Sequence, residues 1–293
     1  MSETKKRIHV VINPAAGKDE PILNTINDVF SQHNVAWTIS VTQKYGDATE
    51  FARKAAEDGF DIVAGYGGDG TQHEIANGIV GTNALMGVLP GGTGNGFANE
   101  MATPTTLKPA LELLCTSQKV RHVDVVQMGD GYFVQRLYVG IEPEKQTSRE
   151  SKDKYGTFAY AIDSFHQAQN QKEYKYQVTI DGEQFEFMAM KLYVVNAAKA
   201  GTGISITGNI SKVDDGLVDI FVLTGKNLRS LTGAADRVLH LDTKNSRDFM
   251  RQGKEVSIDT DPDQPVWTDG EYTGRTPISM KVIPGALSVI VPE

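Results

Sequence analysis

Hydrophobic and polar positions alternate along the first part of the chain, up to about residue 125, in blocks that favour strands and helices in turn. Short β-branched runs predict buried strands, and apolar residues three or four positions apart predict helices. The predicted strands are 8–12, 37–41, 61–64 and 84–89, and the predicted helices are 21–32, 47–58, 74–80 and 107–115. Asp47 with Glu50 predicts a capping box. The alternation is typical of a parallel, Rossmann-like doubly wound sheet.

Beyond Asp124 the pattern changes to short β-rich runs with few helical stretches. The predicted strands are 132–139, 174–180, 184–195, 217–223, 256–258, 278–282 and 287–291, and the predicted helices are 155–167 and 228–241. Asp181-Gly182 separates two alternating runs and predicts a hairpin turn. We expect an α/β domain over 1–127 and a mostly antiparallel β-sandwich domain over 128–293, whose last ten or so residues return to the first domain.

Composition excludes several classes of protein. The chain has 293 residues with 29 basic and 37 acidic side chains, and the net charge of −8 argues against a nucleic-acid binder. Its single cysteine, Cys115, excludes an intrachain disulfide and a cysteine-built zinc site, and we expect an inert core thiol. The apolar run near the N-terminus is too short for a signal peptide, and no run reaches the ~20 residues of a membrane span. We therefore expect a soluble, cytoplasmic protein that meets a membrane only from outside.

Three turns follow the first, third and fourth predicted strands, where open α/β sheets bind ligands. They are Asn13-Pro14-Ala15-Ala16-Gly17-Lys18, Gly67-Gly68-Asp69-Gly70-Thr71 and Pro90-Gly91-Gly92-Thr93-Gly94-Asn95. Each offers backbone N–H groups near a helix start, which suits phosphate. The common dinucleotide and P-loop fingerprints are absent, so the cradle is of another kind. Asp69 would repel phosphate unless a cation such as Mg²⁺ lay between them, and its alternative role is to cap the following helix.

Together, these turns resemble the diacylglycerol kinase catalytic-domain family, particularly the soluble bacterial lipid kinases. The resemblance rests on NPAAG, on GGDGT with Glu74, and on LPGGTGN. NAD kinases and 6-phosphofructokinases share the GGDGT element, and the other two motifs favour the lipid kinases. The resemblance covers nearly the whole chain and includes these further segments: Asp124, Asn196 with Gly201 and Gly203, Asp214 to Leu223, and Asp269-Gly270-Glu271.

The resemblance implies an ATP- and Mg²⁺-dependent kinase that phosphorylates a hydroxyl of diacylglycerol or a related lipid alcohol. Glu271 would be the general base, and Asp69 and Asp124 would orient Mg²⁺ through waters. The implied nucleotide contacts are Asn13, Pro14, Gly17, Lys18, Thr42, Gly67, Gly68, Asp69, Gly70, Thr71, Gly92, Thr93 and Asn95. A structural Mg²⁺ would be held by the Asp215 side chain and the carbonyls of Lys212 and Leu217. On spacing alone, the pattern favours a turn carboxylate over a base at Glu271, and a plain Asp-Gly turn is the alternative at Asp215.

Two positions depart from the family pattern. His73 stands where Asn is usual, and Gly96 replaces an Asp that lipid kinases of the diacylglycerol type carry, although sphingosine kinases also lack it. The change at Gly96 favours another lipid alcohol or a weak activity. Phe97 and Met101 are candidates to line an acyl-chain site, with a core role as the alternative. The basic stretch 145–154 faces either a membrane or solvent.

Two other functions stay open: an NAD-kinase-like kinase of a soluble alcohol, and a catalytically silent nucleotide-binding regulatory protein. The nearness of GGDGT to NAD kinases keeps the first open, and Gly96 keeps the second. The expected partners are a nucleoside triphosphate and a lipid alcohol at a membrane surface, with no nucleic acid. A homodimer is expected only because related bacterial enzymes are often dimeric.

Overall fold

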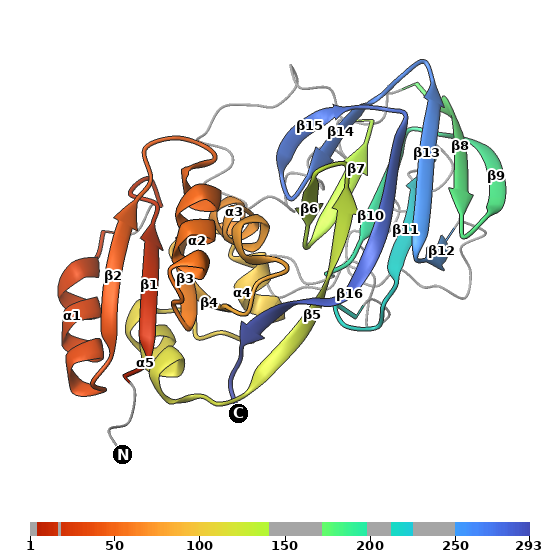
Figure 1. Cartoon of the computed structure of the whole chain (residues 1–293). Helices are drawn as coiled ribbons and strands as arrows, with labels where there is room; N and C mark the ends of the chain where they lie inside the picture. The colour runs from red at the N-terminus through yellow and green to blue at the C-terminus, as the bar shows by residue number, and fades with distance from the viewer. Residues whose placement is uncertain (1–4, 17–18, 141–171, 198–211, 225–249) are drawn as a thin grey trace, which may run out of the picture. The chain divides into compact units, whose positions relative to one another are not determined.

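The computed structural model describes residues 5–16, 19–140, 172–197, 212–224 and 250–293. The chain divides into two compact units, of which the first contains Met1–Val123 with Gly285–Glu293 and the second contains Asp124–Pro284. Figure 1 labels the helices and strands of both units. None of the helices described has the length and apolar character needed to cross a membrane.

The first unit is built on a parallel sheet in the order β2-β1-β3-β4. Its strands are β1 (Arg7–Ile12), β2 (Ala36–Val41), β3 (Ile62–Gly67) and β4 (Leu85–Pro90). The C-terminal end of β16 (Ile278–Ile290) lies parallel to β4, with Val289 opposite Met86. Every residue of β3 is buried, as expected for a parallel strand covered on both faces. The doubly wound sheet predicted from the sequence is therefore confirmed.

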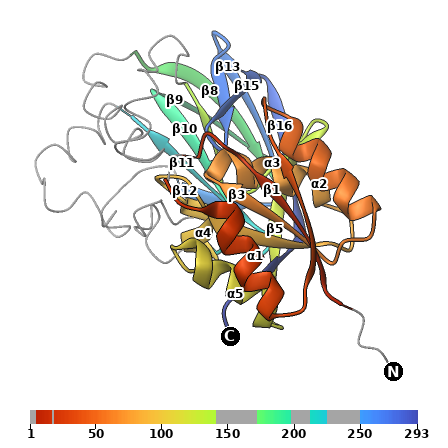
Figure 2. The same ribbon diagram turned by 90° about the vertical axis from the view of Figure 1, so that its left-hand side faces the viewer.

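Helices cover both faces of this sheet (Figures 1 and 2). They are α1 (Ile22–Gln32), α2 (Asp47–Glu57), α3 (Asp69–Ile79), α4 (Gly96–Glu100) and α5 (Leu107–Thr116). The helices α1 and α5 share a core with alternate residues of β1, namely Ile8, Val10 and Ile12. The helices α2 and α3 pack against each other over the opposite face. Each layer thus removes one apolar side of the sheet from water.

The start of α2 differs from the predicted capping box. Asp47 is already helical, and its carboxylate accepts the N–H groups of Gln43 at 2.8 Å and Lys44 at 3.0 Å, which lie before the helix. The N-cap is Gly46, whose φ of 93° is left-handed, and no side chain of its own caps the helix. The predicted capping box of Asp47 and Glu50 is therefore wrong, because the Asp47 carboxylate bonds to the loop that precedes the helix.

The second unit is a sandwich of two antiparallel layers. One layer has the order β16-β13-β8-β9, formed by β8 (Tyr174–Ile180), β9 (Glu183–Ala189) and β13 (Glu255–Asp261) beside β16. The other has the order β12-β11-β10-β7-β14-β15. Its strands are β7 (Arg136–Val139), β10 (Lys191–Val195), β11 (Val218–Leu223), β12 (Met250–Gly253), β14 (Pro265–Thr268) and β15 (Glu271–Arg275). The two layers share one apolar core, which confirms the predicted β-sandwich.

Several strand predictions need correction. The runs 278–282 and 287–291 belong to the single strand β16, which passes through Pro284-Gly285 without ending. The runs 132–139 and 184–195 are each divided between two strands, β6 (Gly131–Phe133) with β7, and β9 with β10. Four strands were not predicted, namely β5 (Val120–Met128), β12, β14 and β15. The predicted helices 155–167 and 228–241 lie outside the described residues.

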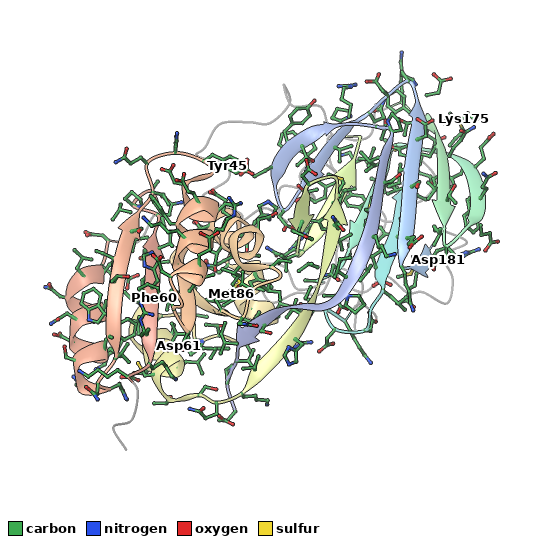
Figure 3. The ribbon with its side chains drawn as sticks, viewed as in Figure 1. Tyr45, Phe60, Asp61, Met86, Lys175 and Asp181 are labelled. Carbon is green, nitrogen blue, oxygen red and sulfur yellow. The ribbon has the colours of Figure 1, made fainter. Side chains whose placement is uncertain are left out.

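The Asp181-Gly182 hairpin is confirmed. The two residues join β8 to β9 with φ values of 48° and 89°. A two-residue turn with positive φ at both positions follows the right-handed twist of the strands, and Asp-Gly suits it. Figure 3 labels Asp181 at the tip of this hairpin.

Candidate functional site

The three turns singled out in the sequence lie at the carboxyl edge of the parallel sheet in the first unit. The Asn13 N–H donates to the Tyr66 carbonyl at 3.0 Å, and the Gly91 N–H donates to the Gly67 carbonyl at 3.0 Å. The ladder between neighbouring strands therefore continues into the turns. This pairing holds the backbones that follow β1, β3 and β4 side by side.

Glycine is required where these turns meet. A Cβ on Gly92 would lie 2.6 Å from the Gly68 Cα, and one on Gly91 would lie 2.9 Å from the Tyr66 ring and 3.2 Å from the Ala16 Cβ. At both glycines these neighbouring atoms leave no room for a side chain. The glycines thus allow one turn to approach another, a role that the sequence alone did not distinguish from the approach of a ligand.

Asn13 joins the first turn to the second. Its Oδ1 accepts the Ala15 N–H at 3.0 Å, and its Nδ2 donates to the Thr71 hydroxyl at 3.1 Å. The same side chain therefore shapes its own turn and fixes the first helical turn of α3. Gly17 and Lys18, which belong to the predicted nucleotide contacts, lie outside the described residues.

The Asp69 side chain bonds to the start of α4, directly after the third turn, and not to its own helix. The helix α3 has Gly68 as its N-cap, without a side-chain bond, so the interpretation of Asp69 as the cap of that helix is wrong. The Asp69 carboxylate accepts the Gly96 N–H at 3.0 Å and the Phe97 N–H at 2.9 Å, at the start of α4. Each oxygen keeps a further lone pair, so the predicted contact with a hydrated Mg²⁺ stays a prediction.

The third turn closes on itself through Asn95. Its Oδ1 accepts the Gly92 N–H at 3.0 Å, its Nδ2 donates to the Gly92 carbonyl, and its φ of 49° is left-handed. Thr93 is exposed at the tip of the turn. Phe97 and Met101 are 1% and 2% exposed, so both belong to the core and line no open surface.

Glu74 has a role that the sequence did not reveal. Its Oε2 accepts the N–H groups of Gly46 at 2.8 Å and Ala48 at 3.1 Å, so it caps α2 from the neighbouring helix α3. Burial raises the pKa of this carboxyl above its usual value, against the effect of the backbone bonds. The adjacent His73 is buried, and its carbonyl accepts the Asn77 Nδ2 at 2.9 Å.

Thr42 follows β2 directly beside the first turn. Its N–H donates to the Ile12 carbonyl at 3.0 Å, and its side chain is half-buried. Ile12 is the last residue of β1 and precedes Asn13. The structure therefore brings Thr42 to the same edge of the sheet as the three turns.

Glu271 begins β15, in the second unit. The preceding Asp269-Gly270 forms a two-residue turn with φ values of 48° and 93°. The Glu271 side chain is half-exposed, and its carboxylate forms no hydrogen bond or ion pair with the residues that the structure describes. Asp181-Gly182-Glu183 repeats the tripeptide with the same turn conformation, so Asp-Gly-Glu by itself does not identify a site.

The carboxylate of Asp269 distinguishes the Asp269-Gly270 turn from the Asp181-Gly182 turn. It is 6% exposed and accepts the N–H groups of Val134 at 2.8 Å, Gln135 at 2.9 Å and Arg136 at 2.8 Å. The sequence contained no signal for this contact, because the partners lie more than a hundred positions away.

Asp124 and the predicted metal loop are directly bonded. The Asp124 N–H donates to the Val213 carbonyl at 2.8 Å, and its Oδ2 accepts the Gly216 N–H at 2.6 Å. The Asp215 Oδ1 accepts the Leu217 N–H at 3.0 Å. Burial raises the pKa of the Asp215 carboxyl, and the nearby Asp124 and Asp214 add to the effect.

A Mg²⁺ ion would counter the repulsion of Asp215 by the nearby Asp124 and Asp214 carboxylates, and its preferred ligands are carboxylate and carbonyl oxygens. Lys212 and Leu217 supply carbonyl groups on either side of Asp215. Within the described part of the chain, no three His, Cys, Asp or Glu side chains are grouped to hold a metal by themselves. The loop therefore suits Mg²⁺ only if its carbonyls take part.

Asn196 joins the parts of this group. It is fully buried, its Nδ2 donates to the Asp124 carbonyl at 2.8 Å and to the Val134 carbonyl at 2.7 Å, and its N–H donates to the Gln135 carbonyl at 2.8 Å. Gly201 and Gly203 lie outside the described residues. The described residues of the predicted nucleotide set thus lie in the first unit, and Asp124, the predicted base and the predicted metal loop lie in the second.

Two family models match successive parts of the chain. Residues 7–128 match the model of the diacylglycerol kinase catalytic domain, and residues 136–291 match that of the YegS C-terminal NAD kinase beta sandwich-like domain. A diacylglycerol kinase of Staphylococcus saprophyticus is 28% identical over 299 residues, covering 99% of this chain and 96% of that protein. One of Staphylococcus aureus strain MRSA252 is 27% identical over 298 residues, covering 99% and 93%. The crystal structure of a diacylglycerol kinase from Bacillus anthracis str. Sterne has a TM-score of 0.82 at 26% identity, covering 98% of this chain and 97% of that chain.

Proposed function

Since this chain is a lipid kinase that belongs to the diacylglycerol kinase family, we propose that it transfers the γ-phosphate of ATP to a hydroxyl group of diacylglycerol or a related lipid alcohol. The observation that carries the proposal is the contact between the three turns at the carboxyl edge of the parallel sheet. A Cβ on Gly92 would lie 2.6 Å from the Gly68 Cα, so only glycine lets the second and third turns meet at the edge where open α/β sheets bind ligands.

The nucleotide would lie along these turns. Asn13 and Thr71 are joined by a hydrogen bond, and Thr93 presents an exposed hydroxyl, which supports a role for this edge in holding phosphates. Mg²⁺ bound with the nucleotide would neutralise charge on the phosphate oxygens. We propose that Asp69 and Asp124 accept hydrogen bonds from its waters.

Glu271 would be the general base. As the alcohol oxygen bonds to the γ-phosphorus, its proton passes to the Glu271 carboxylate and ADP leaves with the electron pair of the broken P–O bond. The half-exposed carboxylate, without a partner among the described residues, supports this role. Glu183 occupies the matching position of the other Asp-Gly-Glu turn, but it is exposed, and Asp181 has no bond to the group around Asp124.

The loop at Asp215 would hold a separate, structural Mg²⁺. We propose the Asp215 carboxylate and the carbonyls of Lys212 and Leu217 as its ligands. The raised pKa of Asp215 supports the proposal, because a cation would offset the repulsion between its charge and the nearby Asp124 and Asp214 carboxylates. The ion would stabilise the segment that bonds to Asp124.

Gly96 bears on the choice of acceptor. Its N–H donates to Asp69 at the start of α4, at the position where the diacylglycerol kinase pattern usually has an aspartate. With glycine, the proposed hydration shell of Mg²⁺ has one carboxylate fewer. We therefore propose a lipid alcohol as the acceptor class, with diacylglycerol as one member to be tested against others.

The test is transfer of labelled γ-phosphate from ATP in the presence of Mg²⁺ and micellar diacylglycerol, other lipid alcohols, NAD or no acceptor. Label should enter a lipid, and Glu271→Gln should reduce the transfer to a small residual rate while Glu183→Gln, in the matching turn, should retain the full rate. Label in NADP would instead favour an NAD-kinase-like activity. Nucleotide binding without transfer to any acceptor would favour a silent regulatory protein.

We further propose that residues 1–127 bind the nucleotide and that 128–293 bind the acceptor, which is reached at a membrane surface from the cytoplasm. The protein would act as a homodimer, as related bacterial enzymes often do. Sedimentation with lipid vesicles tests the membrane contact, and analytical ultracentrifugation tests the oligomeric state. A monomer that transfers phosphate at full rate would refute the need for a dimer.

A further inference from the structure

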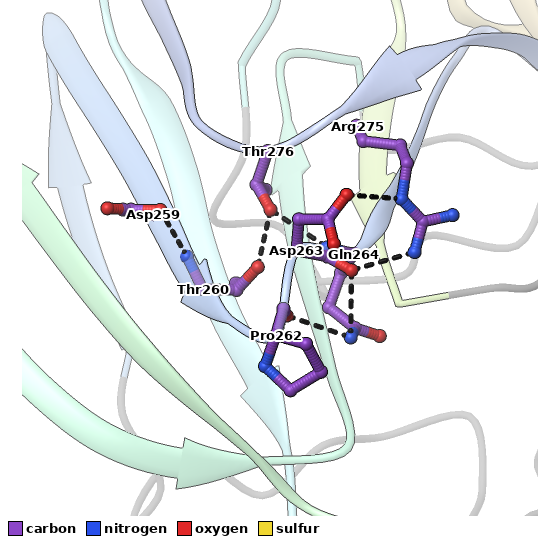
Figure 4. Close-up of polar contacts among 7 residues, drawn as sticks. All are labelled: Asp259, Thr260, Pro262, Asp263, Gln264, Arg275 and Thr276. Atoms are coloured by element: carbon purple, nitrogen blue, oxygen red, sulfur yellow. Dashed lines mark hydrogen bonds and ion pairs between the residues drawn. The ribbon is translucent and has the colours of Figure 1, made fainter.

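The hairpin β14–β15, which carries Glu271, is anchored at its open end by the polar contacts drawn in Figure 4. The Arg275 Nε donates to the Asp263 Oδ2 at 2.7 Å, and the Arg275 Nη2 donates to the Asp263 carbonyl at 2.7 Å. The Gln264 N–H donates to the Thr276 hydroxyl at 2.9 Å, and the Thr276 N–H donates back to the Gln264 carbonyl at 3.0 Å. These bonds hold together the two chain segments at the open end of the hairpin.

The closed end of the same hairpin is anchored by Asp269. Its carboxylate accepts three backbone N–H groups from residues 134–136, and its own N–H donates to the Arg136 carbonyl at 2.9 Å. The side chain is 6% exposed, so these bonds are sheltered from water. Glu271 lies two residues beyond this anchor and pairs with Thr268 across the turn.

The segment that holds Asp269 is itself tied to Asp124. Asn196 donates from its Nδ2 to the Val134 and Asp124 carbonyls, and from its backbone to the Gln135 carbonyl. Asp124 in turn accepts the Gly216 N–H. One continuous network inside the second unit therefore links the turn before Glu271 to Asp124 and to the metal loop.

The other Asp-Gly-Glu turn lacks this connection. Asp181 has the same left-handed φ of 48° as Asp269, and its carboxylate likewise accepts backbone N–H groups, from Lys254 and Glu255. However, Asp181 is exposed, and neither of its partner residues bonds to Asn196 or Asp124. Burial and the network, not the turn conformation, distinguish Asp269.

We propose that Asp269 is a positioning residue, whose three backbone bonds fix the Glu271 carboxylate at one place relative to Asp124. The inference rests on the proposed function, in which Glu271 takes the proton of the acceptor hydroxyl. Asp269 acts through Glu271, because its own oxygens are turned to the 134–136 backbone and each already accepts an N–H group. It adds a specific role to the first residue of the tripeptide.

A double-mutant cycle tests the inference. Asp269→Asn keeps a residue that tolerates the left-handed turn but replaces one accepting oxygen by an amide that cannot accept. A displacement of Glu271 by about 1 Å would lower kcat about 100-fold, with the KM for ATP unchanged. In the Glu271→Gln background, Asp269→Asn should have no further effect on kcat, because residues that act as a unit are not additive.

The matched control is Asp181→Asn, which removes a comparable anchor from the other Asp-Gly-Glu turn and should retain kcat. Thermal unfolding shows that each variant is folded, and Asp269→Ser replaces Asp269→Asn in the cycle if the latter is not. An equal loss of kcat in both backgrounds, or no loss in either, would overturn the inference. Full activity of Glu271→Gln would instead remove the proposed base, whatever the behaviour of Asp269.

Discussion

Gly92→Ala should separate the turns that meet at the carboxyl edge of the first unit. The added Cβ would lie 2.6 Å from the Gly68 Cα, 3.1 Å from the Gly68 nitrogen and 3.2 Å from the Asn95 Oδ1. The nearest atom is backbone and cannot rotate away. Ordinary contact begins at 3.4 Å, so one turn must move from the other by about 0.8 Å.

Such a movement has two measurable costs. Overpacking of this kind lowers the free energy of unfolding by about 1–3 kcal/mol. A shift approaching 1 Å in residues that align the phosphates should lower kcat/KM for ATP about 100-fold. Gly78→Ala is a control with the same overlap elsewhere, since its Cβ would lie 2.6 Å from the Ala52 Cβ and from the Thr49 carbonyl, between α2 and α3.

The assay compares kinase activity and thermal unfolding of both variants with the wild type. Both should melt at lower temperature, by roughly 2–4 °C for each kcal/mol. At a temperature where both are folded, only Gly92→Ala should lose its activity toward ATP. If Gly92→Ala kept wild-type kcat/KM, or if Gly78→Ala lost as much, the contact between the turns would not be what aligns the nucleotide.

Three further outcomes follow from individual side chains. Asp69→Ala leaves the Gly96 and Phe97 N–H groups without the carboxylate that they bond to. It should therefore lower the free energy of unfolding, measured in urea, by about 2 kcal/mol or more. A smaller loss of unfolding free energy in Asp69→Ala than in Asp69→Asn would contradict this account. Burial raises the pKa of Cys115 from 9.0 to about 11, so the thiolate should be about 100-fold scarcer in the folded protein. Near neutral pH, iodoacetamide should therefore alkylate the folded protein about 100-fold more slowly than the unfolded protein. Equal alkylation rates would show that the thiol is not sheltered. The folded-state pKa of Asp215 is raised, so without Mg²⁺ its contribution to stability falls as pH rises above its usual value of 3.8, and Asp215→Asn should melt higher than wild type at neutral pH. Added Mg²⁺ should raise the melting temperature of the wild type and not that of Asp215→Asn. The rise should become smaller as pH falls through the raised pKa of Asp215. An equal rise in the wild type and in Asp215→Asn would place the ion elsewhere.

Local patterns predicted local structure well. The apolar run of β1 and the Asp181-Gly182 turn are decided by neighbours in the sequence, and both are found where the pattern indicates. The gaps arose where a feature depends on distant partners. β16 was read as two strands because Pro284-Gly285 usually ends a strand, yet pairing on both sides keeps it continuous across them.

The site shows the same limit. The three turns were identified from their glycines, because a glycine cluster at a strand end is a local signal. The partner of Asp69 lies 27 positions away, so the sequence could not distinguish a contact with Mg²⁺, a cap on its own helix and a bond to α4. The partners of Asp269 lie further still, and its difference from Asp181 is one of burial, which the tripeptide does not encode.

The first unit depends on residues made late in translation. Its sheet has β16 beside β4, and the Ser117 hydroxyl donates to the Val291 carbonyl at 2.7 Å while the Val291 N–H donates to the Lys119 carbonyl at 3.1 Å. A ribosome needs on the order of 10–30 s to add Asp124–Pro284 before these residues emerge. Throughout that interval β4 is an open edge that can pair with other nascent chains. A fragment that stopped after Val123 would keep that edge permanently, so aggregation of such a fragment would report missing residues 285–293 and not a faulty fold.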